Sequence, residues 1–271
     1  MIPLEYAALR VTRRIMPESA VAWLRNRRLF LVPGLETRKP EEAVDRYVDH
    51  LTKANVGLSG KRVMLLGYGG SFGVGIGLLR RGARHVTLVD PFVGPNRDEN
   101  ERFLTDAPDY VHEENGQIEV NDAFLSVRDV GVCELAQTGD GGFDLVLSSS
   151  VLEHVMGLGR LVECLRALTA EQGVGLHFVD LRDHFFKYPF EMLCHSDRTW
   201  HSLLEPRTRL NRKRLWDYEG LFSAHFRRVS IEILESDPQA LLKVKRRIRP
   251  EFLRGDLERD SVCKIAIFYE V

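Results

Sequence analysis

This chain of 271 residues lacks the features that would assign it to a membrane or to a nucleic acid. No segment approaches the roughly 20 consecutive apolar residues that cross a bilayer, so we expect no membrane partner. The 38 Lys and Arg residues are balanced by 39 Asp and Glu residues, which argues against a basic nucleic-acid coat and against an acidic disordered tail. The remaining composition, 44% apolar and 28% charged, is that of an ordinary globular protein with a sizeable core.

Cysteine is also scarce, and its spacing argues against a structural zinc site. The four cysteines, Cys133, Cys164, Cys194 and Cys263, are far apart and form no Cys-x-x-Cys pair. We therefore expect reduced core thiols in a cytoplasmic protein, and no bound metal. The N-terminal segment lacks an uninterrupted apolar stretch followed by a small-residue cleavage site, so it does not resemble a secretory signal.

Residues 1–59 are predicted to form an N-terminal helical extension. Pro40 can occupy the first position of a helix, and Ala43, Val44, Tyr47 and Leu51 then share one apolar face. A less regular helix is expected upstream, over residues 19–30.

A strand, glycine loop, helix and second strand follow from residue 61. Val63 to Leu66 is a short apolar run typical of a parallel strand covered on both faces. The second strand, His85 to Val89, ends at Asp90. Between them stand Gly67, Gly69, Gly70, Gly73, Gly75 and Gly77. Glycines let the backbone turn tightly and approach a ligand, and an acid at the next strand end can accept ribose hydroxyls. The unit therefore predicts a nucleoside-cofactor site.

The rest of the chain continues the alternation of strands and helices. Further strands are expected over residues 123–128, 143–148, 174–181, 228–234 and 262–271. Apolar residues recur at helical spacing from Leu158 to Leu168, and Gly173 can follow that helix as its terminator. Residues 182–226 form an irregular insertion after the fifth strand. This order predicts a doubly wound α/β domain over residues 60–271.

Two segments resemble class I S-adenosylmethionine-dependent methyltransferases of the type 11 kind. They are LLGYGGSFGVGIGLLRRGARHVTLVDPF and FDLVLSSSVLEHV, in this order, and the resemblance covers about residues 60–181. It implies a Rossmann-like, mostly parallel sheet of seven strands with an antiparallel C-terminal strand. It also implies S-adenosylmethionine as the cofactor.

The resemblance assigns cofactor contacts to residues of the strand ends. Asp90 would hold the ribose, Phe92 would lie against adenine, and Asp129, with Asp122 as its rival, would meet the adenine amino group. The absent side chains of Gly69 and Gly73 would make room for the cofactor. The full set is Gly67, Gly69, Gly70, Ser71, Gly73, Asp90, Phe92, Asp129 and Ser148.

One position departs from the family pattern. Leu65 stands where the family often has an acid that orients the amino group of the cofactor. A catalytically silent module with the methyltransferase fold therefore stays open as an alternative.

Methyl transfer needs positioning and, for a hydroxyl or ammonium acceptor, removal of a proton. Ligands bind at the carboxyl ends of the strands in α/β sheets, which selects His154 and His184 as candidate bases. The alternative for His154 is a residue that only packs beside the cofactor.

The acceptor is predicted to be a small molecule with an anionic or polar group, methylated at oxygen or nitrogen. The insertion after the fifth strand combines aromatic residues such as Trp200 with basic residues such as Arg198, which suits a substrate lid. An ordinary subdomain core with a solvated rim would explain the same pattern.

Two other activities remain as alternatives. An NAD-dependent oxidoreductase of the short-chain type would need a Tyr-x-x-x-Lys pair, which Tyr110, Tyr188 and Tyr218 do not supply. An RNA-directed methyltransferase would use the basic run Lys243 to Arg249 near the cofactor cleft, but the near-neutral net charge argues against nucleic acid as a partner.

Overall fold

The architecture comes from a computed structural model, which describes residues 4–15, 39–185, 187–205 and 209–271. The helix predicted over residues 19–30 lies outside the described residues. Within the described part of the chain, no helix combines the length and apolar character needed to cross a membrane.

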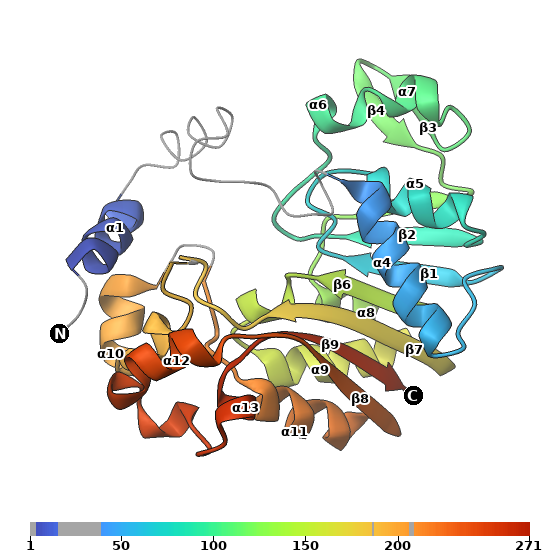
Figure 1. The fold of residues 1–271 in the computed structure, drawn as a ribbon. Helices are drawn as coiled ribbons and strands as arrows, with labels where there is room; N and C mark the ends of the chain where they lie inside the picture. The colour runs from blue at the N-terminus through green and yellow to red at the C-terminus, as the bar shows by residue number, and fades with distance from the viewer. Residues whose placement is uncertain (1–3, 16–38, 186, 206–208) are drawn as a thin grey trace.

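One twisted sheet of seven strands forms the centre of the molecule (Figure 1). Its order is β5-β2-β1-β6-β7-β9-β8. Neighbours from β5 to β7 are parallel, whereas β9 is antiparallel to both β7 and β8. The strands are β1 (Arg62–Leu66), β2 (His85–Val89), β5 (Leu125–Arg128), β6 (Phe143–Ser149), β7 (Thr169–Asp180), β8 (Arg228–Ser236) and β9 (Val262–Glu270). All seven predicted strands are found, and the predicted fold class is confirmed.

Helices cover both faces of this sheet (Figure 1). On one face pack α4 (Pro40–Lys53) and α5 (Gly73–Arg80), and on the other α8 (Val132–Thr138), α9 (Leu158–Leu168) and α11 (Leu215–His225). The apolar face predicted for α4 is buried against α5 and the strands, so α4 belongs to the core of the domain although it lies in the range predicted as an extension. Helix α11 likewise belongs to the sheet core although it lies within the predicted insertion.

A third apolar core lies beside the sheet. It joins Tyr6 of α1 (Leu4–Ile15), Trp200 of the insertion and Leu241 of α12 (Pro238–Val244), all fully buried. Helix α1 and the segment around α10 (Asp197–Thr199) lie next to each other at one side of the molecule (Figure 1). The insertion therefore forms a subdomain with its own core, into which the N-terminal helix packs. The remaining short helices are α6 (Arg97–Asn100), α7 (Phe103–Asp106) and α13 (Leu257–Asp260).

Three details differ from the sequence expectations. The strands β3 (Val111–Glu114) and β4 (Gln117–Val120) form a hairpin that was not predicted; the Asn115-Gly116 pair at its turn, with φ of 51° and 77°, is the sequence signal that could have found it. The sulfurs of Cys133 and Cys164 are bonded between α8 and α9, so the prediction of reduced thiols is wrong for this pair. Only Cys194 and Cys263 are free.

The third detail concerns the end of α9. Gly173 does not terminate this helix, because β7 begins at Thr169 and contains Gly173. A Cβ on Gly173 would lie 2.7 Å from the Phe143 carbonyl oxygen, so this glycine allows the strand to approach β6 closely.

Candidate functional site

The carboxyl ends of five parallel strands meet at one edge of the sheet. The strand order reverses between β1 and β6, and α/β sheets bind ligands in the crevice at such a point. On one side, β1 leads into the glycine loop, β2 into Asp90 and β5 into Asp129. On the other side, β6 leads into the 3-10 turn Leu152–His154 and β7 into His184. The edge thus has two halves, one on each side of the switch point.

The first glycines of the motif shape the loop after β1. Gly67, Gly69 and Gly70 have φ of 78°, 63° and 81°, a backbone region that only glycine adopts at little cost. A Cβ on Gly67 would collide with the side chain of Val151, which packs over the loop from the end of β6. These glycines are needed for the turn itself.

A buried asparagine holds this loop in place. The side chain of Asn100 accepts a hydrogen bond from the Phe72 amide and donates one to the Gly70 carbonyl, each at 2.8 Å. It is fully buried, so these bonds are shielded from water. Asn100 is a positioning residue that the sequence analysis missed, because it lies 28 residues after Phe72 and on a separate short helix.

The later glycines serve helix packing. A Cβ on Gly73 would lie 2.8 Å from the ring of Pro40 and 3.2 Å from Phe103, and a Cβ on Gly77 would lie 2.6 Å from Val44. Helix α5 therefore contacts α4 through these two glycines. The space that a side chain on Gly73 would take is filled by Pro40 and Phe103, and contact of this glycine with a cofactor stays a prediction. Ser71 is also buried, and its hydroxyl accepts a hydrogen bond from the Gly73 amide at 3.3 Å.

Asp90 joins the glycine loop to the segment after β2. One carboxylate oxygen accepts hydrogen bonds from the amides of Phe92 and Val93, at 2.9 and 3.2 Å. The other accepts one from the Gly69 amide at 3.4 Å, which leaves it acceptor capacity for a ligand. Phe92 is 93% exposed and follows Asp90 by two residues. A planar base could therefore lie against the exposed Phe92 ring.

Tyr68, inside the glycine loop, is a candidate that the sequence analysis did not name. It is 1% exposed, and its hydroxyl has no hydrogen-bond partner among the described residues. Burial raises the pKa of Tyr68, and the neighbouring Asp129 and Asp90 carboxylates raise it further, so the hydroxyl keeps its proton and is a donor. Asp129 follows β5 at this edge, whereas its rival Asp122 precedes β5 at the opposite end of the strand.

Two other predicted positions point into the core. Ser148 is fully buried, and its hydroxyl lies 2.7 Å from Nδ1 of His177, in the layer of α9 and α11. Burial lowers the pKa of His177 to about 3, so this imidazole is neutral at pH 7. Because the Ser148 side chain is engaged there, only its backbone is left to contact a cofactor. Leu65 is buried in the core below α4 and α5.

The second half of the edge brings His154 and His184 together, with Glu153 beside them. The two imidazole rings lie 4.9 Å apart, edge to face. Glu153 is buried, and one of its carboxylate oxygens accepts a hydrogen bond from the Asp180 amide at 3.3 Å. One potential ligand atom from each of these three side chains lies within 4.8 Å of the others. The two histidines are the predicted candidate bases; no metal was predicted, and Glu153 was not among the predicted residues.

The protonation of the two histidines bears on their chemistry. Burial lowers the pKa of His184 to about 4, and the neighbouring His154 contributes to this. A base with so low a pKa is weak at pH 7, which disfavours His184 as the general base. The ring nitrogen Nδ1 of His154 lies 2.8 Å from the Arg209 carbonyl, which can only accept, so this nitrogen carries a proton.

Several aromatic and basic side chains of the insertion are used internally, whereas Arg198 is exposed. Trp200 is fully buried in the third core, and Arg212 and Arg214 are buried donors to backbone carbonyls. Arg182 donates to both Asp180 and Glu235. This arrangement favours the ordinary subdomain core over an aromatic and basic wall for an anionic acceptor.

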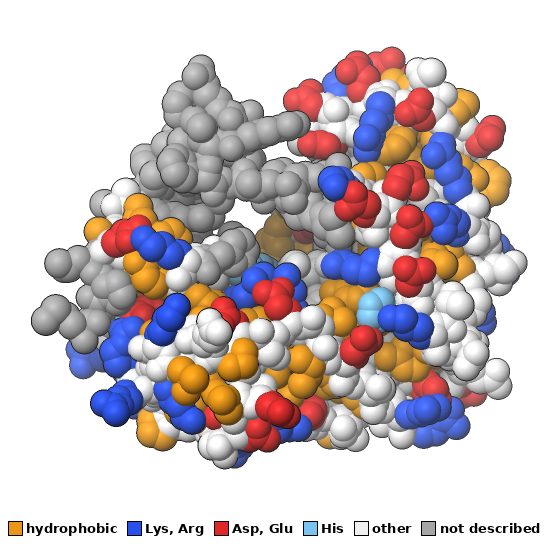
Figure 2. Space-filling model, viewed as in Figure 1, with side chains coloured by type: hydrophobic (Ala, Val, Ile, Leu, Met, Phe, Trp, Pro, Cys, Tyr) orange, Lys and Arg blue, Asp and Glu red, His pale blue; other side chains and the backbone are white. Residues whose placement is uncertain are grey.

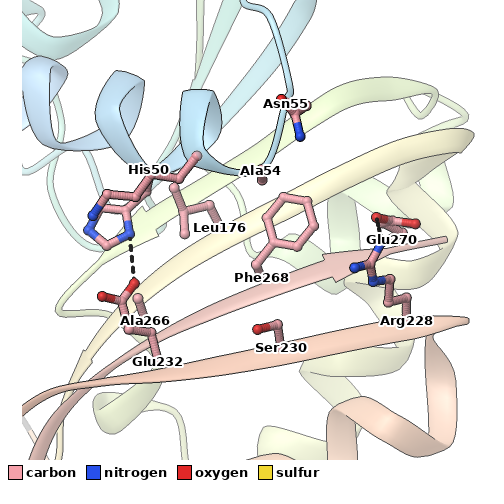
Figure 3. Close-up of a pocket in the computed structure, with 11 residues that line it drawn as sticks. His50, Ala54, Asn55, Leu176, Arg228, Ser230, Glu232, Ala266, Phe268 and Glu270 are labelled. Carbon is pink, nitrogen blue, oxygen red and sulfur yellow. Dashed lines mark hydrogen bonds and ion pairs between the residues drawn. The ribbon is translucent and has the colours of Figure 1, made fainter.

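The hollow drawn in Figure 3 lies away from this edge. It measures about 310 Å³ and is formed by the end of α4 and the antiparallel strands β8 and β9. Its ionisable groups face each other: His50 points toward Glu232 at 3.3 Å, and Arg228 toward Glu270 at 3.3 Å (Figure 3). This hollow lies among the antiparallel strands and away from the carboxyl ends of the parallel strands, so the carboxyl edge remains the candidate site.

Comparison with known proteins gives a match in structure alone. No protein-family model matches the chain, and no curated protein matches it in sequence. A solved structure described as a sarcosine dimethylglycine methyltransferase from Galdieria sulphuraria is 15% identical, with a TM-score of 0.52 over 84% of this chain and 85% of that chain. The chain has the class I methyltransferase fold.

A second solved structure leads to the same fold. Phosphoethanolamine N-methyltransferase 2 of Haemonchus contortus, in complex with phosphomonomethylethanolamine and S-adenosylhomocysteine, is 14% identical with a TM-score of 0.52. The match covers 84% of this chain and 52% of that chain. The resemblance drawn from the glycine loop and the LEHV segment is thus confirmed for the methyltransferase fold.

Proposed function

We propose that this chain is an S-adenosylmethionine-dependent methyltransferase that acts on an oxygen or nitrogen of a small-molecule acceptor. The fold supports the reaction type, since the two structural neighbours are named for methyl transfer to small amines. The observation that carries the proposal is the Tyr68 hydroxyl, a buried donor without a described partner between two carboxylates at the switch point of the sheet.

The residues of the first half fit the adenosine part of the cofactor. Asp90 would accept the ribose hydroxyls, Asp129 would accept from the adenine amino group, and Tyr68 would donate to a ring nitrogen or a ribose oxygen. Phe92 offers an exposed ring for the adenine face. The left-handed turn at Gly67, Gly69 and Gly70 would let the backbone approach the methionine part.

When bound, the cofactor supplies an electrophilic methyl group on a sulfonium. The acceptor atom forms a bond to the methyl carbon while the carbon–sulfur bond breaks, and the electron pair stays on sulfur as S-adenosylhomocysteine. A hydroxyl or ammonium acceptor must also lose one proton. The acceptor would lie at the second half of the edge, beside His154 and His184, and the protein would contribute mainly its orientation.

The two other activities find less support. A dinucleotide-binding dehydrogenase sheet has the parallel order 3-2-1-4-5-6, whereas here antiparallel β9 lies between β7 and β8. For RNA, the basic run is partly neutralised within the protein, because Arg247 makes two 2.6 Å bonds to Glu191 and Arg249 bonds Glu251. Figure 2 shows that acidic side chains predominate over α6, α7 and the β3–β4 hairpin, where residues 97–120 contain eight Asp and Glu and two Arg, so this surface does not favour a phosphate backbone.

Calorimetry tests the cofactor, and a labelled extract tests the acceptor. S-adenosylhomocysteine should bind, and NADH should bind more weakly or not at all. The protein with labelled S-adenosylmethionine should then transfer label into the metabolite fraction of a cell extract. Label in RNA alone would contradict the small-molecule acceptor, and no binding of S-adenosylhomocysteine would favour the silent module.

A further inference from the structure

Glu153, His154 and His184 form a compact cluster of one carboxylate and two imidazoles at the carboxyl edge. They come from different elements: Glu153 and His154 from the turn after β6, and His184 from the loop after β7. One carboxylate with two imidazoles is a common ligand set for divalent transition metals, whereas Mg²⁺ and Ca²⁺ prefer oxygen ligands alone. Three protein ligands, the number found among the described residues, would leave coordination positions for a substrate.

The distances fit a site that is close to assembled. Three ligand atoms at about 2.0 to 2.2 Å from one ion lie about 3 to 3.5 Å from one another. In the unliganded chain they lie within 4.8 Å of one another. Binding of an ion would draw the three ligand atoms about 1 to 2 Å closer together.

The tautomer of His154 also suits metal binding. Because Nδ1 donates to the Arg209 carbonyl at 2.8 Å, the lone pair of the ring is on Nε2. Histidines that bind metals usually donate their other ring nitrogen to a carbonyl or carboxylate, which orients the ring. The backbone at Arg209 has a φ of 55°, an unusual value for a residue other than glycine, and this conformation aims its carbonyl at His154.

Neighbouring side chains hold the two ligand segments in place. Asn211 donates from its side chain to the carbonyls of Leu152 and Val155, at 2.7 and 3.0 Å, and from its amide to the Glu153 carbonyl at 2.9 Å. The turn that carries Glu153 and His154 is therefore clamped by the insertion.

The loop that carries His184 is held from the other side. Asp183, directly before it, is fully buried, accepts a 2.6 Å hydrogen bond from the Tyr6 hydroxyl and pairs with Arg10. Helix α1 thus anchors the third ligand. Such support is what separates a built site from a chance cluster of polar side chains.

We infer that Glu153, His154 and His184 bind one divalent transition-metal ion, of the Zn²⁺ type, beside the methyl-transfer position. In the context of the proposed function, on which this role rests, the ion would coordinate an oxygen of the acceptor and lower its pKa. The hydroxyl proton would leave to solvent, and the acceptor oxygen would then attack the methyl carbon. This narrows the acceptor to a molecule with an oxygen that can bind the ion.

Metal content and affinity test the site without an activity assay. The untagged chain, treated with chelator and then given Zn²⁺, should bind about one Zn²⁺ per chain, as measured by mass spectrometry of the metal. Mg²⁺ at the same concentration as Zn²⁺ should not displace it. Glu153→Gln, His154→Gln and His184→Gln should each weaken Zn²⁺ binding at least about tenfold in calorimetry. The matched control is His112→Gln, an exposed histidine of the β3–β4 hairpin, which should leave binding unchanged.

Further measurements separate the possible failures. Circular dichroism checks that each variant folds. If the Glu153→Gln chain does not fold because Glu153 is buried, the variants of His154 and His184, which are partly exposed, still test the site. When Co²⁺ is bound in place of Zn²⁺, its absorption spectrum should lack thiolate bands. That result would exclude Cys194 and Cys263 as ligands. Absence of stoichiometric Zn²⁺, or equal uptake by the His154→Gln and His184→Gln chains, overturns the inference. Binding of S-adenosylhomocysteine to the metal-free chain tests the proposed function separately.

Discussion

Replacing Gly73 by Ala tests whether the second part of the glycine motif serves helix packing. The added Cβ would lie 2.8 Å from two ring carbons of Pro40 and 3.2 Å from Phe103, where about 3.4 to 4 Å is ordinary contact. The proline ring cannot rotate away, so α4 must shift. Overpacking of this kind lowers the free energy of unfolding by about 1 to 3 kcal/mol. The better helix propensity of Ala offsets less than about 1 kcal/mol of this loss. We expect the free energy of unfolding to fall by about 1 to 2 kcal/mol.

Urea denaturation and calorimetry give the two readouts. Gly73→Ala should lower the urea midpoint while the affinity for S-adenosylhomocysteine changes less than about threefold. The matched control is Gly220→Ala, since Gly220 lies in α11 with no atom within 4 Å of an added Cβ; it should stabilise the chain by about 0.5 to 1 kcal/mol. Gly67→Ala, in the left-handed turn, should weaken binding strongly. Lost binding with an unchanged midpoint in Gly73→Ala would refute the packing argument.

Four further expectations follow from the site and the cores. Asp90→Ala should lower the affinity for S-adenosylhomocysteine about ten- to a hundredfold in calorimetry, and also the urea midpoint, because three backbone amides lose their acceptor. Tyr68→Phe should leave the midpoint nearly unchanged but weaken binding several-fold, since its hydroxyl lacks a partner among the described residues; equal affinity would remove Tyr68 from the site. Trp200→Ala should cost about 3 to 5 kcal/mol of stability in urea, as expected for a core residue rather than a lid wall. Lowering the pH from 7 to 5 should cost about 2 kcal/mol through His177, because its folded pKa lies below that window and the unfolded chain binds the proton; a His177→Gln chain with the same pH dependence would contradict this.

Much of the fold can be predicted from local sequence. The apolar runs that begin at Val63 and Phe143 are long enough for a strand and too short for a typical helix. A continuous apolar run also indicates a strand that is buried on both faces, whichever strands pair with it. The same holds for the apolar face of α4, whose residues share one side of a helix by spacing alone. The position of Asp90 at a strand end follows in the same way.

The pairings between distant segments required the tertiary structure. Gly67 and Gly73 look alike in the motif, yet one makes the turn and the other makes room for Pro40, because only the packing of α4 on α5 decides what lies beside each Cα. Ser148 was expected at the cofactor, and the register of β6 against β7 decides which side chain it meets: its hydroxyl lies 2.7 Å from Nδ1 of His177.

The sequence by itself determined the elements and the chemistry at their ends, since strand length, helix periodicity and turn glycines are local properties of the chain. Only the tertiary structure decided which of these ends share a space. Glu153 and His154 stand 31 and 30 residues before His184, and Asn211 lies further on, so no spacing rule links them. Their meeting depends on β6 and β7 being neighbours in the sheet and on the insertion folding back over the turn, both of which arise from the burial of distant apolar faces.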